Sequence, residues 1–557
     1  MEKGKPKLFG KILLFIAFAV PFLLASCRNY PIENTYADSA ASANGMMGNG
    51  MMDHGNMMGD SAQKSATTSS INSKAIERST NGLNNAKETS IVELSGWQAY
   101  NVEAKPVAKE INGNKIRMLA YNGQIPGPIL KVKLNSAAYI NFTNNMDVPT
   151  TIHWHGVRVE NQYDGVPDVT QKPVMPGQSF LYKLDFPDEG IYWYHPHMRE
   201  DMQQELGLYG AIIVEPSNKN YYNKADKEIV LFLDDISMQG SDVTPFYDDY
   251  ITHALMGRFG NTMLINGKES YNIEVEKGDA MRFYIINVAN SRTFNLMVEG
   301  HKMKIIGSDS GRYEDEFFAD SQIIGVSERY IAEVLFESEG SFNIMHKTPE
   351  KEYIMGKIKV KPSSKEIPKE FYDIKKNQNP SLQDEDYKKY LLMSPDYNFE
   401  LTVDMSMMDM ELNRAMMDNM MISDKEPIEW EDDMPEMNAL STSENIKWAI
   451  KDRKTGKQNM DINYKVKKGE IKKIQILNNP KSMHPMQHPI HIHGQRFLVL
   501  SIDGKENENL AWKDTVLIPA GSTVDLLVDF SNPGKWMMHC HIAEHLHSGM
   551  MTAFTVE

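Results

Sequence analysis

Ten of the sixteen histidines lie in four short clusters, and this pattern constrains the chain more than any other feature. The clusters are HWH at 153–155, HPH at 195–197, HPIHIH at 488–493 and HCHIAEH at 539–545. They stand among short β-like runs, and in a strand the two histidines of an HxH pair project from one face. Four such pairs in a β context predict clustered metal ligands. Imidazole suits copper, zinc, iron and nickel, so the histidines alone do not identify the metal.

Cys540 lies between His539 and His541. The alternation that aligns these two histidines directs Cys540 to the opposite face, so its thiolate is expected to serve a different metal. Two histidines, a cysteine and a weak axial methionine form the ligand set of a blue-copper electron-transfer site. The other members of this set would be His488, His545 and Met550. The remaining eight clustered histidines would then bind several metals nearby.

The second cysteine, Cys27, ends an N-terminal targeting segment. Four lysines precede an apolar stretch at 12–24, which is shorter than the ~20 residues that span a bilayer. The LASC that follows resembles a bacterial lipoprotein box, with an ordinary secretory signal as the alternative. We predict a lipoprotein signal peptide at 1–27, lipidated at Cys27, and an extracytoplasmic protein anchored to a bacterial membrane on its periplasmic side or at the cell surface. Cys540 would then be the single thiol of the mature chain, which favours metal ligation over a disulfide.

The chain is too long for one ordinary core, and its pattern predicts an all-β protein of three domains. Residues 28–90 are rich in Ser, Ala, Asn, Gly and Met, so we expect a disordered tether. Thereafter short strand-like runs and Gly/Pro turns favour β-sandwiches or Greek-key barrels. We place the domains at 91–216, 217–362 and 395–557, with a linker at 363–394. The formal charge of −16 argues against a nucleic-acid partner.

Two methionine-rich segments interrupt the β pattern. One is GMMGNGMMDHGNMM at 45–58, within the tether. The other, at 405–421, has eight methionines in seventeen residues and no Gly or Pro, which is compatible with a helix. We assign it to an insertion in the third domain at about 404–440. A thioether is a soft ligand that favours Cu(I), with flexible apolar filler as the alternative role.

The four clusters, in this order, resemble those of the three-domain, laccase-like multicopper oxidases over residues 95–557. IPGP at 125–128 and WKDTV at 512–516 support the likeness. The resemblance implies three cupredoxin-like Greek-key domains and four copper ions per chain, one of type 1 and three in a cluster between the first and third domains. It assigns His488, Cys540, His545 and Met550 to type 1, His153 and His491 to type 2, and His155, His195, His197, His493, His539 and His541 to type 3 copper.

The resemblance also implies a reaction, in which four one-electron oxidations at type 1 copper reduce O₂ to two waters at the cluster. Asp164 matches the acid that the family keeps beside the cluster, and the alternative is a turn residue in YDGVPD. Many relatives have an acid directly after the second type 1 histidine. Leu546 holds that place here, so the second proton donor stays open.

The methionines favour Cu(I) as electron donor, in copper tolerance. Met486 matches a position that binds substrate copper in cuprous oxidases of the family. His484 stands where those enzymes have an acid, and it is either a copper ligand or a loop cap. Softer candidates for a Cu(I) path are Met405, Met408, Met416 and Met420, with Asp404 and Asp409. The alternatives are a laccase that oxidises phenols or aromatic amines, and a copper-sequestering lipoprotein.

Besides His484, five histidines lie outside the ten predicted ligands. We expect His547 to be exposed, and His253, His301 and His346 to be structural. His54 would either join the methionines of the tether in copper capture or have no role.

Overall fold

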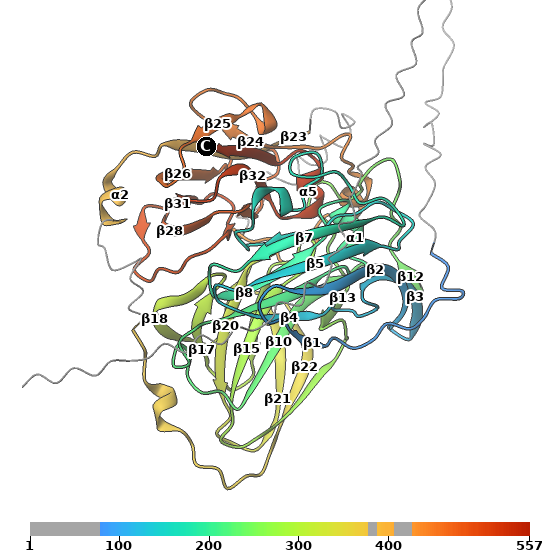
Figure 1. Ribbon diagram of the computed structural model, residues 1–557, viewed down its shortest axis with the longest axis vertical. Helices are drawn as coiled ribbons and strands as arrows, with labels where there is room; N and C mark the ends of the chain where they lie inside the picture. The colour runs from blue at the N-terminus through green and yellow to red at the C-terminus, as the bar shows by residue number, and fades with distance from the viewer. Residues whose placement is uncertain (1–77, 377–386, 406–425) are drawn as a thin grey trace, which may run out of the picture. The chain divides into compact units, whose positions relative to one another are not determined.

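The computed structural model describes residues 78–376, 387–405 and 426–557, and their regular secondary structure is mostly β-strand (Figure 1). Several predictions fall outside the described residues: the signal peptide with Cys27, residues 28–77 of the tether with His54, and Met408, Met416, Met420 and Asp409. Asn85 already pairs with Ala108, so ordered structure begins before the predicted start at residue 91. Among the described residues, none of the helices has the length and apolar character needed to cross a membrane.

The first domain consists of two sheets, with strand orders β3-β2-β5-β7 and β1-β4-β9-β8-β6. Its strands are β1 (Ile91–Glu93), β2 (Gln98–Ile111), β3 (Asn114–Tyr121), β4 (Ile129–Lys133), β5 (Ala137–Asn144), β6 (His153–His155), β7 (Ser179–Asp185), β8 (Gly190–His195) and β9 (Gly210–Glu215). Two short helices, η1 (Asn161–Tyr163) and α1 (Glu200–Gln203), follow β6 and β8.

The second domain also has two main sheets, with orders β13-β10-β15-β20-β17-β18 and β14-β22-β21-β16-β19. Its elements are β10 (Lys227–Ile236), β11 (Met238–Gln239), β12 (Asp242–Val243), β13 (Thr262–Ile265), β14 (Tyr271–Glu276), β15 (Ala280–Asn287), β16 (Phe294–Val298), β17 (Met303–Ser308), β18 (Gly311–Ala319), β19 (Gln322–Ile324), β20 (Arg329–Leu335), β21 (Gly340–Lys347), β22 (Glu352–Lys361) and η2 (Lys369–Tyr372).

The third domain repeats this plan, with orders β24-β23-β26-β31-β28-β29 and β25-β33-β32-β27-β30. Its elements are α2 (Lys388–Leu392), β23 (Tyr397–Asp404), α4 (Pro435–Leu440), β24 (Lys447–Asp452), η4 (Asn459–Asp461), β25 (Asn463–Val466), β26 (Glu470–Asn478), β27 (His488–Ile492), β28 (Arg496–Ile502), β29 (Lys505–Glu506), β30 (Thr515–Ile518), β31 (Thr523–Phe530), β32 (Gly534–Cys540), α5 (Ala543–His547) and β33 (Met551–Val556). The predicted all-β fold is therefore confirmed.

Alternation of apolar and polar residues explains the outer strands. In β14, Ile273 and Val275 are buried while Asn272, Glu274 and Glu276 are exposed, because one face packs on the core and the other meets water. Strand β8 is buried at all positions because both of its faces are covered. One face joins the core of the first domain, and the other packs against strands of the second domain.

The shared plan of the domains places the histidines. In the first domain β6 pairs with β8, and in the third β27 pairs with β32, so each pair of strands brings two histidine clusters together. The corresponding pair in the second domain, β16 and β21, carries only His346, which is opposite Leu296. Metal ligands are therefore expected from the first and third domains.

Candidate metal centres

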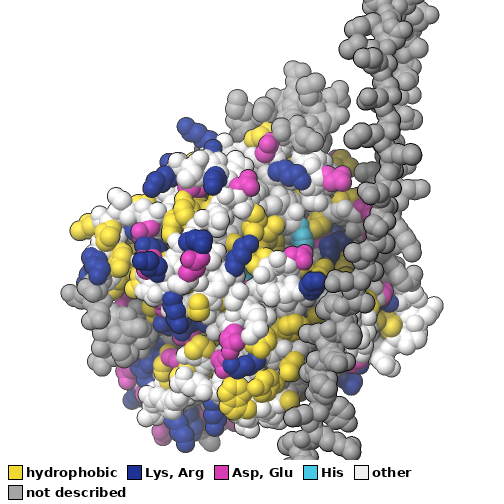
Figure 2. All heavy atoms as spheres, turned by 45° about the horizontal axis from the view of Figure 1, so that its top comes forward, with side chains coloured by type: hydrophobic (Ala, Val, Ile, Leu, Met, Phe, Trp, Pro, Cys, Tyr) yellow, Lys and Arg dark blue, Asp and Glu magenta, His cyan; other side chains and the backbone are white. Residues whose placement is uncertain are grey.

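The strand register brings histidines from distant parts of the chain side by side. His153 lies opposite His195 across β6 and β8, and His491 lies opposite His539 across β27 and β32. The two domains meet here, because the rings of His155 and His491 stack with their centroids 3.7 Å apart. On the face shown in Figure 2, histidine side chains are nearly absent from the surface, as expected for buried clusters.

The first candidate centre surrounds Cys540. Its Sγ lies 3.6 Å from His488 Nδ1 and 3.7 Å from His545 Nδ1, and the two nitrogens are 3.3 Å apart. Met550 is held nearby, because its carbonyl accepts the Cys540 N–H and its N–H bonds to the His545 carbonyl. All four side chains are buried. The three facing donors fit one ion of the type that prefers a His₂Cys set.

The second candidate centre contains the other eight predicted ligands. One trio is formed by His197, His493 and His539, in which the Nε2 atoms of His493 and His539 face each other at 2.9 Å. A second trio has ring centroids 5.0–5.7 Å apart and consists of His155, His195 and His541. The remaining two, His153 and His491, lie between the trios, with ring contacts to both.

Unpartnered nitrogens provide a test of whether this cluster suits metal ions. A buried polar atom without a partner is costly unless a ligand satisfies it. Here the buried atoms without a hydrogen-bond partner are Nε2 of His153, His195, His197, His491 and His541, and Nδ1 of His155. Their concentration in one place is what a cluster of copper-binding imidazoles requires. The residues present therefore fit copper.

Burial keeps these groups in the protonation states that precede metal binding. It lowers the pKa of His488 to about 3. It also lowers the pKa of the imidazoles of His155, His195, His491, His493, His539, His541 and His545. Each of these rings is neutral at physiological pH and offers a lone pair. Burial also raises the pKa of the Cys540 thiol, so a metal ion must displace its proton to bind there.

Asp164, the predicted acid, lies against the cluster. It follows η1 and is buried, its Oδ2 accepts from His493 Nδ1 at 2.9 Å, and its carbonyl accepts from His153 Nδ1 at 2.8 Å. This one residue thus orients a ring from each of the two metal-binding domains.

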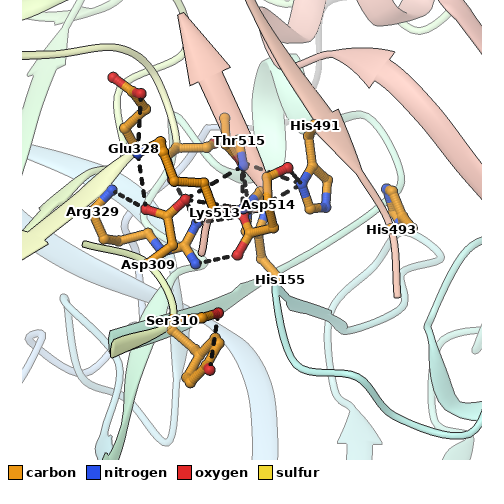
Figure 3. A network of polar contacts seen from close by, with 12 residues as sticks. His155, Asp309, Ser310, Glu328, Arg329, His491, His493, Lys513, Asp514 and Thr515 are labelled. Atoms are coloured by element: carbon orange, nitrogen blue, oxygen red, sulfur yellow. Dashed lines mark hydrogen bonds and ion pairs between the residues drawn. The ribbon is translucent and has the colours of Figure 1, made fainter. Parts of the chain in front are cut away.

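A second carboxylate, Asp514, makes similar contacts, although the sequence reasoning did not single it out. It lies 3.0 Å from His155 Nε2, and its carbonyl accepts from His491 Nδ1 at 2.9 Å. Burial alone would raise the pKa of the Asp514 carboxyl. The Arg329 guanidinium beside it (Figure 3) instead holds this pKa well below its usual range. Its place in WKDTV, a motif that supported the resemblance, was the signal that pointed to it.

A third carboxylate, Glu200, corrects the expectation for His547. Glu200 lies three residues after His197 and is 3.0 Å from His197 Nδ1, and His547 Nε2 lies 2.5 Å from its other oxygen. The side chain of His547 is only 25% exposed, so the prediction that it is exposed was wrong. It was wrong because α5 packs against α1, where a buried carboxylate meets the ring. The pair joins the first and third domains.

Two buried tryptophans pack against the ligands. Trp193 stacks on His195 with ring centroids 4.1 Å apart, and the ring centroids of Trp448 and His545 are 4.2 Å apart. The Trp448 Nε1–H donates to the carbonyl of Ala254 in the second domain. These rings restrict the orientations of the histidines they touch.

Two of the methionines predicted to bind substrate copper can be placed in the structure, and both are buried. Met405 and Met486 are buried in the same apolar core as Cys540 and Met550, and His484 is buried as well. The partly buried methionines packed against that core are Met434, Met437 and Met483. No helix can be assigned to 406–425, which lies outside the described residues. The described helix of this region is α4, which carries Met437.

Comparisons with known proteins agree with this geometry. Three family models, each described as multicopper oxidase, match residues 103–219, 217–358 and 430–557. The multicopper oxidase mco of Staphylococcus aureus is 28% identical over 472 residues, covering 82% of this chain and 88% of that protein. The multicopper oxidase MmcO of Mycobacterium tuberculosis is 25% identical over 478 residues, with coverages of 80% and 85%.

Solved structures show the same likeness. A multi-copper oxidase from Pseudomonas thermotolerans has a TM-score of 0.63 at 25% identity, covering 83% of this chain and 100% of that one. A multicopper oxidase from Campylobacter jejuni, described as a metallo-oxidase, has a TM-score of 0.63 at 24% identity, with coverages of 86% and 99%. The cupredoxin-like sandwich fold is therefore shared with proteins of this kind.

Proposed function

Because the chain belongs to the multicopper oxidase family, we propose that it oxidises Cu(I) with O₂ as the acceptor, using four bound copper ions, and so contributes to copper tolerance. Membership of the family makes it a copper-dependent oxidoreductase that uses oxygen. The choice of Cu(I) as the reducing substrate and the assignment of the four copper positions are our proposal.

In this proposal the protein holds the Cys540 site and the histidine cluster close together in one rigid framework. When bound, copper supplies one-electron transfer at the Cys540 site and reduction of O₂ to water at the histidine cluster. Cys540 and its chain neighbours His539 and His541 connect the two sites by a few covalent bonds. Asp164 and Asp514 orient rings of the cluster, and burial of the histidines limits the access of bulk water to the reacting atoms.

The methionines of the core that contains Cys540 support Cu(I) as the donor. The core that contains Cys540 includes the buried side chains of Met405, Met486 and Met550 together with Met256. The partly buried Met434, Met437 and Met483 extend this set outward. Because thioethers are soft ligands, they favour Cu(I) over harder cations. Met486, two residues before His488, is the best candidate for the last position on such a path.

Oxygen uptake with two donors tests the proposal. The copper-loaded protein, prepared without residues 1–27, is supplied with Cu(I) or with a simple phenol at matched concentrations. We expect fast turnover of Cu(I), and Met486→Leu, which keeps the volume but removes the thioether, should lower kcat/KM for Cu(I) at least about tenfold. Met281→Leu, in the core of the second domain, is the matched control. Fast phenol oxidation with slow Cu(I) turnover would refute the proposal.

A cavity favours one second candidate, oxidation of aromatic reductants. It has a volume of about 550 Å³, and its lining includes Tyr247, Tyr250, His253, Leu440 and Glu444. The adjoining segment reaches the Cys540 centre, because the Leu255 carbonyl lies 3.3 Å from His545 Nε2. A phenol in this cavity would be separated from His545 by that short segment.

Filling the cavity distinguishes the two candidates. Leu440 is 64% exposed at the rim, so Leu440→Trp should narrow the cavity without disturbing the core. Leu392→Trp, at a residue that is 95% exposed, is the control. Selective loss of phenol turnover would support the laccase candidate. Many copper ions bound per chain with little O₂ uptake would instead favour the copper-sequestering alternative.

The proposal includes an extracytoplasmic location, with the chain anchored to a bacterial membrane through lipid at Cys27. Its support is the LASC sequence after a positively charged, apolar segment. Incorporation of labelled fatty acid by the full chain, and its loss in Cys27→Ser, would bear it out. If the unsubstituted full chain carries no fatty-acid label and is released in soluble form, lipidation at Cys27 is refuted.

A further inference from the structure

The second domain contributes no predicted ligand, yet one of its side chains reaches a carboxylate that contacts the cluster. Arg329 begins β20 and is fully buried, and its two terminal nitrogens form a paired contact with the Asp514 carboxylate, with Nη1 at 2.6 Å from Oδ1 (Figure 3). Its other donors are also used, by the carbonyls of Ile191 and Ser327. The guanidinium is thus fixed by groups from all three domains.

On its other side, Asp514 determines which nitrogen of His155 is available. Its Oδ1 lies 3.0 Å from His155 Nε2, and a carboxylate that is ionised can only accept a hydrogen bond. His155 Nε2 therefore carries the proton, and the buried Nδ1 is left with a lone pair and no partner. The tautomer of a ligating histidine is set in this way by the bond that its second nitrogen makes.

His155 is turned the opposite way from its neighbours. In His153, His195 and His491, Nδ1 is bonded to a backbone carbonyl and Nε2 is the unpartnered nitrogen. In His155 the roles are exchanged, because Nε2 meets the Asp514 carboxylate at 3.0 Å and the Thr515 hydroxyl at 2.9 Å. The Thr515 hydroxyl in turn donates to Asp514 Oδ1, so the carboxylate orients this ring both directly and through Thr515.

Arg329 is the cation that keeps Asp514 in this position. Within the described residues, no lysine and no other arginine forms an ion pair with Asp514, since the neighbouring Lys513 pairs with Asp309 and Glu328. A buried carboxylate without a partner either becomes protonated or turns away. A lysine would not replace the paired contact, because the planar guanidinium matches both carboxylate oxygens at once.

We propose that Arg329 is a positioning residue for the metal cluster: through Asp514 it holds His155 with Nδ1 directed toward the metal, and it thereby makes the metal-free second domain part of the centre. The inference rests on the proposed function, in which this cluster binds copper. A purely structural role would be an ion pair that ties domains together, with no influence on the ligands.

Four variants separate these roles. Arg329→Met removes the cation, Arg329→Lys keeps the charge without the paired contact, and Asp514→Asn keeps the shape without the charge. The control is Arg282→Met, which breaks a buried ion pair to Glu333, a residue of the strand β20 that also carries Arg329. Among the described residues, the hydrogen bonds and ion pairs of Arg282 involve Glu333, Glu228 and Asn223 and no clustered histidine. Thermal unfolding of the metal-free proteins establishes that each variant is folded.

The measurements are copper per chain by mass, the electron paramagnetic resonance spectrum of the cluster, and the visible absorption of the Cys540 thiolate–copper bond. We expect Arg329→Met, Arg329→Lys and Asp514→Asn to weaken copper binding in the cluster about 10- to 100-fold and to change its spectrum. The Cys540 absorption should persist in all of them, and Arg282→Met should retain both centres.

Two results would overturn the proposal. One is a parent-like cluster spectrum and copper content in Arg329→Met and Asp514→Asn. The other is equal loss of cluster copper in Arg282→Met. If Arg329→Met does not fold, Asp514→Asn decides by the same readouts. A parent protein without cluster copper would refute the proposed function itself, whereas a loaded parent with loaded variants would refute only the role of Arg329.

Discussion

Alanine at Gly156 is expected to be far more damaging than alanine at another glycine of similar conformation. Gly156 ends the HWHG motif and has φ of +82°, and Gly177 in an exposed turn of the same domain has φ of +78°. A side chain in this left-handed region costs about 1–2 kcal/mol. At Gly177 a Cβ would meet nothing within 4 Å, so this backbone cost is the whole expected loss.

At Gly156 a second cost is added. The Cβ would overlap Asp514 Oδ2 and would lie 2.8 Å from Arg329 Nη2 and 3.0 Å from Tyr192 Cδ1. All three side chains are buried, so none of them can turn toward solvent. The ion pair must therefore separate, and breaking a buried pair costs about 3–5 kcal/mol. Gly156→Ala should therefore lower the free energy of unfolding by about 3 kcal/mol more than Gly177→Ala does, or by a larger amount.

Urea unfolding of the metal-free variants measures this difference directly, because the two share the backbone cost and differ only in the contact. Copper content of the loaded variants provides a second readout, which should fall in Gly156→Ala alone. Equal losses of stability in the two variants would refute the reasoning, since they would mean that the Arg329–Asp514 pair tolerates an extra carbon.

Three further predictions follow from single contacts. Burial lowers the pKa of His346 to about 3 from 6.5, and its Nδ1 accepts the Asn295 N–H, so only the unfolded chain gains its proton as pH falls below 6.5. His346 alone should contribute a loss of about 1.4 kcal/mol of stability per pH unit in that range, so His346→Gln should make thermal midpoints depend less steeply on pH; an unchanged slope would contradict this. Cys540→Ser should abolish the visible absorption of the thiolate–metal bond while cluster copper, measured by mass, persists; loss of both would show that the centres depend on each other. Glu200→Gln should destabilise the chain by about 1–3 kcal/mol through its contact with His547, and an unaltered urea midpoint would exclude that contribution.

Much of the fold was predictable because strand periodicity is local information. Short apolar runs such as 129–134 and 523–530 became β4 and β31, and the predicted all-β fold is correct. The same periodicity predicted that Cys540 faces away from its neighbours. In the structure its Sγ meets His488 and His545, while His539 meets His493.

Contacts between domains were not predictable in the same way. His547 and Glu200 are separated by 347 residues, and Arg329 and Asp514 by 185, so no local pattern relates them. Both pairs depend on how the sandwiches pack, which hydrophobic periodicity does not encode. The sequence left the second proton donor open, because Leu546 stands where many relatives have an acid. In the structure a nearby acid, Glu544, is buried, and burial raises its pKa to about 7.

The two centres differ in how much of the chain must exist before they form. The Cys540 centre joins residues at most 62 positions apart, from His488 to Met550, all within the third domain. The cluster joins His155 in the first domain to groups 359 residues further on, in the third domain. A chain without its first domain therefore keeps all four ligands of the Cys540 centre but loses His153, His155, His195 and His197 from the cluster, whatever the supply of metal. Occupancy of the cluster thus reports that the first and third domains are both present and docked, which occupancy of the Cys540 centre does not report.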